Sequence, residues 1–208
     1  MDLTIRKSSQ IEEIDYNFLK SALANYKHPR VKINEMLKSG KIIRVKKGLY
    51  VFGKELADQP FSKETLANLI YGPSYISLEY ALAFYGLIPE RVEVVTSVTN
   101  KRNKSFDTSV GYFSYRYIHP DLYSNGITLH EMDRYHWILI GSKEKALSDM
   151  LYFNEQFDNE ADLEKYLLEN LRIEPESFVS FNLNKIKKLA TLYGYNVKLF
   201  YNVLRSYK

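Results

Sequence analysis

The apolar residues in the first quarter of the chain change from helical spacing to β-type spacing. Residues 11–25 place an apolar stripe on one helical face, formed by Ile14, Phe18, Leu19 and Ala22. A second helix is predicted from Pro29, which suits a first helical turn, to a stop at Ser39-Gly40. The runs Ile42–Val45 and Leu49–Phe52 then predict a β-hairpin that turns at Gly48.

A linker is predicted at residues 53–61, before a longer region that mixes helices and strands. Helices are predicted at 62–71, 77–85, 142–153, 160–171, 184–193 and 196–206. Strands are predicted at 92–98, 111–118, 127–130 and 137–140. The pattern therefore predicts an α+β protein of two domains. These are a winged helix-turn-helix at 1–54 and a domain at 62–208 with a small mixed sheet and C-terminal helices.

Charge is distributed unevenly along the 208 residues. Residues 1–54 carry twelve basic and five acidic side chains, a net charge of +7. Residues 55–181 carry eleven basic and twenty acidic side chains, a net charge of −9. Residues 182–208 carry six basic and no acidic side chains, a net charge of +6. The stretch from Lys27 to Lys54 alone has nine Lys or Arg and one acid, Glu35. Basic ends around an acidic middle suggest separate surfaces for separate partners, and unevenly solvated charge is the alternative interpretation.

A helix followed by a basic hairpin is typical of a DNA-binding winged helix. Lys and Arg on a hairpin meet phosphates, whereas Arg and Asn on a helix form directional bonds with guanine and adenine. Arg30 and Asn34 are therefore the candidates for base contacts. The predicted DNA-binding residues are Arg30, Lys32, Asn34, Lys38, Lys41, Arg44, Lys46 and Lys47. A secondary basic face is predicted at Lys185, Lys187, Lys188, Lys198 and Arg205.

Two residues of the second predicted helix have alternative interpretations. Asn34 is either a base contact or an ordinary solvated helix residue. Val31 falls on the outward side of the helix, where it either touches thymine methyl groups or packs on a neighbouring loop. Packing on a loop is the favoured interpretation of Val31.

The composition excludes several classes of protein. The chain has no Cys, which excludes disulfide scaffolds, thiolate metal sites and Cys nucleophiles. The N-terminus lacks the apolar core of a signal peptide, and no apolar run approaches the length of a membrane span. We therefore expect a cytoplasmic protein with no membrane contact.

Candidate catalytic and metal-ligating residues are few. Pro120-Asp121 with Glu144-Lys145 resembles a Pro-Asp…Glu-x-Lys nuclease pattern, but Lys145 directly follows Glu144, so the spacing is wrong. Three metal-competent residues lie close in sequence, namely His130, Asp133 and His136. Their neighbours predict strand and turn, so these residues would not share a helical face. The sequence has no glycine-rich phosphate loop and no dinucleotide fingerprint. We expect no enzymatic activity, no cofactor and no metal.

Three motifs in order along the chain resemble a known family. The first runs from Leu37 through Gly40, Arg44 and Gly48 to Tyr50. The second runs from Ile76 through Ser77, Ala81-Leu82 and Gly86 to Leu87. The third runs from Gly141 through Glu144-Lys145-Ala146-Leu147 to Asp149. Over about residues 11–155 the chain resembles the AbiEi-type antitoxins, which are transcriptional regulators of abortive-infection toxin–antitoxin systems.

The resemblance implies a function in phage defence. It implies a winged helix that binds inverted repeats in double-stranded DNA upstream of its own operon, and a following domain that counters a nucleotidyltransferase-like toxin. It also implies a basic C-terminal face, which residues 182–208 would supply. Unlike the family, the chain has no clear Gly-containing turn before the helix at Pro29.

Two other classes of protein stay open. One is a winged-helix transcription factor with a ligand- or protein-sensing C-terminal domain and no toxin. The other is a protein-binding module whose basic ends contact an acidic partner.

Overall fold

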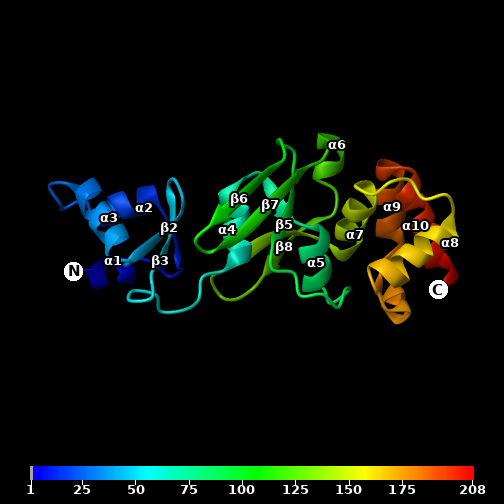
Figure 1. Ribbon diagram of the computed structural model, residues 1–208, viewed down its shortest axis with the longest axis horizontal. Helices are drawn as coiled ribbons and strands as arrows, with labels where there is room; N and C mark the ends of the chain where they lie inside the picture. The colour runs from blue at the N-terminus through cyan, green and yellow to red at the C-terminus, as the bar shows by residue number, and fades with distance from the viewer. Residues whose placement is uncertain (1) are drawn as a thin grey trace.

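The computed structural model describes residues 2–208, with side chains from Ile5 onward. Figure 1 shows an elongated molecule in which three parts follow one another in chain order, with the termini at opposite ends. The N-terminal part contains a three-stranded sheet, the middle part a six-stranded sheet, and the C-terminal part helices. The predicted α+β class is therefore confirmed.

The N-terminal part has six elements. They are α1 (Asp2–Lys7), β1 (Glu13–Asp15), α2 (Tyr16–Ala22), α3 (Pro29–Lys38), β2 (Ile42–Lys46) and β3 (Leu49–Phe52). β3 lies between β1 and β2 and is antiparallel to both. The helix predicted over 11–25 is wrong at its start, because Glu13–Asp15 forms a strand. The Asp15 carboxylate accepts a hydrogen bond from the Phe18 N–H and so starts α2 at Tyr16.

The helix predicted from Pro29 and the hairpin after it are confirmed. Gly40 has a φ of 72°, and the Lys41 N–H donates to the Met36 carbonyl at 2.9 Å, which closes the end of α3. Gly48 has a φ of 87° in the hairpin turn. Ile33 and Met36 are buried, so α3 is held in place by its apolar face.

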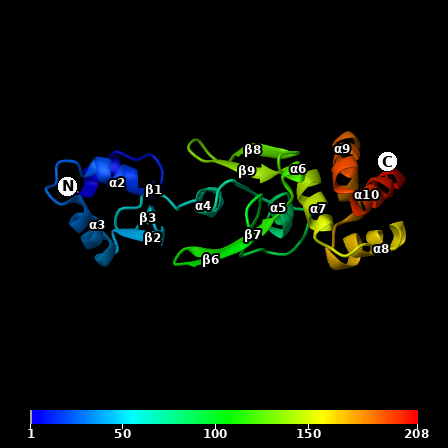
Figure 2. The same ribbon diagram turned by 90° about the horizontal axis from the view of Figure 1, so that it is seen from above.

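The middle part is a mixed sheet with strand order β6-β7-β5-β4-β9-β8. Its strands are β4 (Ser74–Ile76), β5 (Val95–Thr99), β6 (Lys104–Thr108), β7 (Gly111–Tyr117), β8 (Ile127–Glu131) and β9 (Trp137–Gly141). Its helices are α4 (Lys63–Ile70), α5 (Leu78–Phe84) and α6 (Pro120–Tyr123). Figure 2 shows the β6–β7 and β8–β9 hairpins at opposite edges, with α4 between them. The sequence pattern predicts four of these strands and misses β4 and β6.

The C-terminal part is helical. It contains α7 (Lys143–Tyr152), α8 (Glu160–Lys165) with a π-helical turn at Tyr166–Asn170, a 3-10 helix at Pro175–Ser180, α9 (Leu183–Tyr193) and α10 (Tyr195–Ser206). α7 follows β9 directly and contacts α5, α9 and α10. It therefore joins the sheet to the last helices.

The β2–β3 hairpin contributes to two hydrophobic cores. Tyr50 and Phe52 belong to the small core of the N-terminal part. Leu49 and Val51, on the alternate face of the same strand, belong to the large core that runs through the middle and C-terminal parts. β3 is therefore buried on both faces, and it connects the N-terminal part to the rest of the molecule.

Candidate nucleic-acid interface

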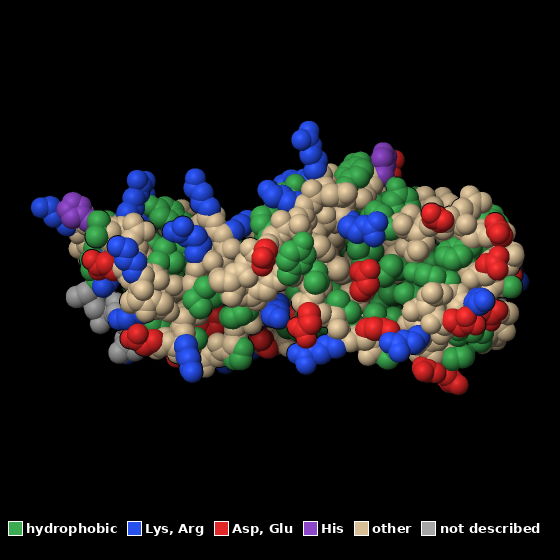
Figure 3. Space-filling model, viewed as in Figure 1, with side chains coloured by type: hydrophobic (Ala, Val, Ile, Leu, Met, Phe, Trp, Pro, Cys, Tyr) green, Lys and Arg blue, Asp and Glu red, His purple; other side chains and the backbone are tan. Residues whose placement is uncertain are grey.

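α3 and the β2–β3 hairpin enclose a groove of about 850 Å³. Four of the eight predicted DNA-binding residues line this groove, namely Arg30, Asn34, Arg44 and Lys47. A smaller hollow of about 450 Å³ shares Asn34 and Arg44 with it and adds Lys38. All five side chains are exposed. Figure 3 shows Lys and Arg gathered over the N-terminal part, while Asp and Glu are frequent at the opposite end. The structure thus brings these predicted residues to one concave, basic surface.

Two tyrosines place the arginines of the groove. The Arg30 Nε donates to the Tyr16 hydroxyl at 3.2 Å, which raises the pKa of the guanidinium and keeps it charged. The Arg44 guanidinium lies 5.9 Å from the centroid of the Tyr50 ring, at cation–π distance. No sequence pattern pointed to Tyr16, because it lies on a different helix from Arg30.

Lys46 does not line the groove. A β-bulge between Arg44 and Lys46 breaks the two-residue alternation of side chains along β2. The side chains of Arg44 and Lys46 therefore have different surroundings. The Lys46 Nζ donates to the carbonyls of Leu69, at 3.2 Å, and Ile70, at the C-terminal end of α4. Burial lowers the pKa of Lys46, and the nearby Lys104 and Lys101 lower it further. Lys46 therefore ties the hairpin to the middle part, where its charge suits the negative end of the helix dipole.

The two other predicted DNA-binding residues are Lys32, which lies on α3, and Lys41, which lies just after it. Lys32 lies 3.6 Å from the Glu35 carboxylate, and Lys41 lies 3.5 Å from that of Glu55, so acidic neighbours offset part of both charges. Val31 is 55% exposed. The favoured interpretation, that Val31 packs on a loop, is therefore wrong, and its methyl groups face solvent on the helix that lines the groove.

The predicted C-terminal basic residues are all exposed on the last two helices. On α9, Lys185 and Lys188 line a hollow of about 250 Å³ together with Ser142, whereas Lys187 is not among its lining residues. Lys198 and Arg205 lie on α10, where the Arg205 guanidinium is 6.0 Å from the Tyr201 ring. The structure therefore brings Lys185 and Lys188 to one hollow, whose lining does not include Lys198 or Arg205.

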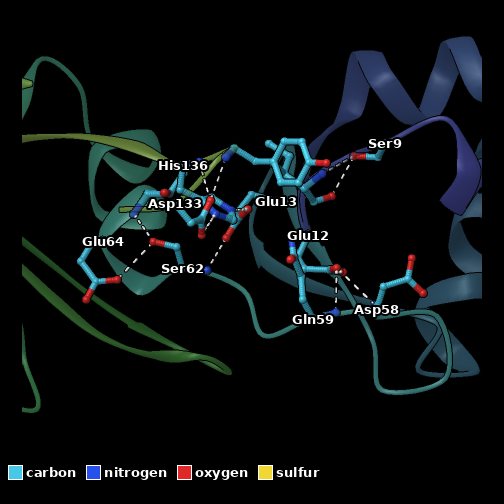
Figure 4. A network of polar contacts seen from close by, with 12 residues as sticks. Ser9, Glu12, Glu13, Asp58, Gln59, Ser62, Glu64, Asp133 and His136 are labelled. Carbon is cyan, nitrogen blue, oxygen red and sulfur yellow. Dashed lines mark hydrogen bonds and ion pairs between the residues drawn. The ribbon is translucent and has the colours of Figure 1, made fainter. Parts of the chain in front are cut away.

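A buried histidine joins the N-terminal part to the middle part (Figure 4). The His136 Nε2 lies 3.0 Å from Glu13 Oε2, and its Nδ1 lies 2.7 Å from Asp133 Oδ2. Glu13 also accepts a hydrogen bond from the N–H of Ser62, the residue that caps α4. Burial opposes a positive charge on His136, but the hydrogen bonds with Asp133 and Glu13 outweigh it and raise the pKa of the imidazole.

Several residues whose sequence pattern suggested a metal site or a nuclease make other contacts in the structure. His130 packs edge-on against the Phe84 ring, with the centroids 5.1 Å apart. Among the described residues, no group of three or more His, Asp and Glu side chains could hold a metal ion. Lys145 is fully buried with its Nζ 3.1 Å from Asp149 Oδ1. The Glu144-Lys145 pair is therefore part of the core in this structure.

No protein family and no curated protein matches this chain. None of the described helices has the length and apolar character that a membrane crossing requires.

Proposed function

We propose that the protein is a winged helix-turn-helix repressor that binds the operator of its own operon. The observation that carries this proposal is the basic groove between α3 and the β2–β3 hairpin, where Arg30, Asn34, Arg44 and Lys47 meet. The order helix, strand, helix, helix and hairpin supports the winged-helix assignment.

The side chains of the groove suggest a division of roles on duplex DNA. α3 would enter the major groove, where Asn34 pairs with adenine, Arg30 with guanine, and the exposed methyl groups of Val31 touch thymine. Arg44 and Lys47 on the hairpin would contact phosphates, which supply affinity and salt dependence but no sequence preference.

Charge reversal on the hairpin tests the phosphate contacts. The Arg44→Glu/Lys47→Glu variant should lose about tenfold or more in affinity for operator and scrambled duplexes alike, and its salt dependence should become shallower by roughly 0.9 per lost contact. Fluorescence anisotropy at several salt concentrations measures both effects. The matched control is Arg91→Glu/Lys165→Glu, which reverses two exposed charges outside the N-terminal part. Unchanged affinity in the hairpin variant would exclude this interface.

Asn34→Ala should act on sequence preference instead. It should reduce the difference in binding free energy between operator and scrambled duplexes by about 1–3 kcal/mol. Equal losses on both duplexes would make Asn34 a non-specific contact.

Toxin neutralisation, as in the AbiEi-type antitoxins, is the second half of the proposal. A protein partner is supported by exposed apolar side chains on the β8–β9 hairpin, where Leu129 lies opposite Leu139 and Trp137 is 49% exposed. Co-purification with the product of a neighbouring nucleotidyltransferase-like gene tests this half. Duplex binding with no such partner would favour a winged-helix regulator without a toxin.

A further inference from the structure

Three lysines converge outside the duplex-binding groove, near Tyr71 at the end of α4. Lys101 and Lys104 come from the β5–β6 region, and their Nζ atoms lie 5.5 Å and 5.6 Å from the Tyr71 centroid. Lys46 reaches the same place from the hairpin, close enough that Lys104 and Lys101 lower its pKa. Among the described residues, no carboxylate forms an ion pair with any of the three. Lys101 and Lys104 stand out because they lie in residues 55–181, which carry a net charge of −9.

The lysines are held by groups that do not neutralise their charge. The Lys101 Nζ donates to the Gly72 carbonyl at 2.5 Å, and the Lys46 Nζ donates to the Ile70 carbonyl. Cation–π contacts add attraction without adding a negative charge. Like charges that are held close repel one another, and an anion between them would relieve that repulsion.

A hollow of about 630 Å³ opens beside this cluster. Its lining combines cations, amides and rings, namely Tyr71, Asn100, Lys101, Arg102, Asn103 and Tyr117. Tyr117 is 43% exposed. The Asn103 Oδ1 accepts a hydrogen bond from the Tyr117 N–H at 2.6 Å, which leaves the side-chain NH₂ of Asn103 as a donor for a ligand.

We propose that this hollow binds a nucleotide with an unstacked base, placing its phosphates on Lys101 and Arg102, beside Lys104, and its base against Tyr117. Cations alone would fit any phosphate, but the exposed ring and the amides beside it fit a planar, hydrogen-bonding base. A duplex would leave Tyr117 unused because its bases are stacked inside the helix. A free nucleotide and a single strand share the required chemistry. The site goes beyond the proposed duplex binding and does not depend on it.

Calorimetric titration of the full chain with ATP, tripolyphosphate, a short oligo-dT strand and a DNA duplex tests this site. The Lys101→Gln/Lys104→Gln variant should weaken ATP or oligo-dT binding by about tenfold or more, since it removes charge-assisted contacts. The control is Arg91→Gln/Lys165→Gln, which removes two exposed charges that belong to neither predicted basic face and should leave the affinity unchanged. Tyr117→Ala should weaken the binding of ATP about tenfold and leave the binding of tripolyphosphate unchanged, because only ATP has a base.

The outcomes separate the ligand sources and the two sites. Binding of ATP alone identifies a free nucleotide, and binding of oligo-dT alone identifies a single strand. The proposal is overturned if Lys101→Gln/Lys104→Gln changes the affinity for neither ATP nor oligo-dT. It is also overturned if this variant weakens the binding of the duplex alone. The Arg44→Glu/Lys47→Glu variant should bind ATP normally, so a failed duplex interface remains distinct from a failed nucleotide site. Since all the substituted side chains are exposed, unchanged thermal unfolding should accompany each variant.

Discussion

At the scale of single residues, two of the three motifs that suggested a family contribute to one buried polar network. Asp149, the end of the third motif, accepts hydrogen bonds from Ser77 at 2.7 Å, Tyr75 at 2.9 Å and Tyr193. Ser77 belongs to the second motif and precedes α5, yet its hydroxyl bonds to Asp149 and does not cap the helix. The resemblance in these two motifs therefore includes residues whose hydrogen bonds join the region of β4 to α7.

Lys145 is the cation of this network, and we expect its loss to be costly. Lys145→Met should lower the free energy of unfolding by about 3–5 kcal/mol, because it leaves the Asp149 charge buried without its cation. The chain offers a matched control at the same i,i+4 spacing in Lys165 and Glu169, whose side chains are 68% and 66% exposed. Lys165→Met should cost less than about 0.5 kcal/mol. Urea unfolding measures both variants, and equal losses would contradict the structural role of Lys145.

The residues that line the groove could be predicted from the sequence only where the periodicity of the helix or strand is regular. Arg30 and Asn34 follow helical spacing, so α3 carries both to the groove. Lys46 could not be separated from Arg44 by pattern, because a β-bulge leaves no periodic trace in the sequence. Lys46 lies far from Lys101 and Lys104 in the sequence, so no local pattern could predict that these three lysines form a cluster.

At the scale of elements, the longest helices are the elements that the sequence predicts best. α3, α7, α9 and α10 lie close to their predicted bounds. The strand β6 was missed because it is an edge strand of mostly exposed polar residues, and β4 because three residues are too few for a period to be recognised. β1 interrupts a helical pattern because its pairing with β3 outweighs local propensity.

The hairpin and the end of α3 depend on a close approach at Gly53. A Cβ at Gly53 would lie 1.8 Å from the Gly40 carbonyl oxygen, while the Gly53 N–H donates to the Lys41 carbonyl at 2.8 Å. Gly53→Ala should therefore lower the free energy of unfolding by about 3 kcal/mol or more, since backbone must move. Gly48 has open space but a φ of 87°, so Gly48→Ala should cost only about 1–2 kcal/mol. Urea unfolding that ranks Gly48→Ala as the worse variant would refute this account.

At the scale of the whole molecule, the N-terminal part is fastened to the sheet at several points. Lys46 bonds to the end of α4, and the Ser109 hydroxyl donates to the Arg44 carbonyl at 3.2 Å. Glu12 accepts from the N–H groups of Asp58 and Gln59 in the connecting segment. With β3 shared between two cores, these contacts fix the direction in which the basic groove faces relative to the middle part.

His136 makes this attachment sensitive to pH. Its pKa is raised in the folded protein, so its charged form stabilises the fold fully below the ordinary histidine pKa of about 6.5. That stabilisation is lost as pH rises through the raised pKa. His136→Gln should therefore cost roughly 1–3 kcal/mol in slightly acidic solution, where the imidazole is charged between Glu13 and Asp133, and progressively less in alkaline solution.

Urea unfolding of the wild type and His136→Gln across about pH 6 to pH 9 measures that difference. His119→Gln is the control, because His119 is 58% exposed beside Asp121 and its replacement should have a small effect. Hydrogen exchange at the β1 amides gives a second readout, since Glu13 lies on β1, and His136→Gln should speed exchange there more than in α9. Parallel stability curves for wild type and His136→Gln would mean that the charge on His136 does not hold the two parts together.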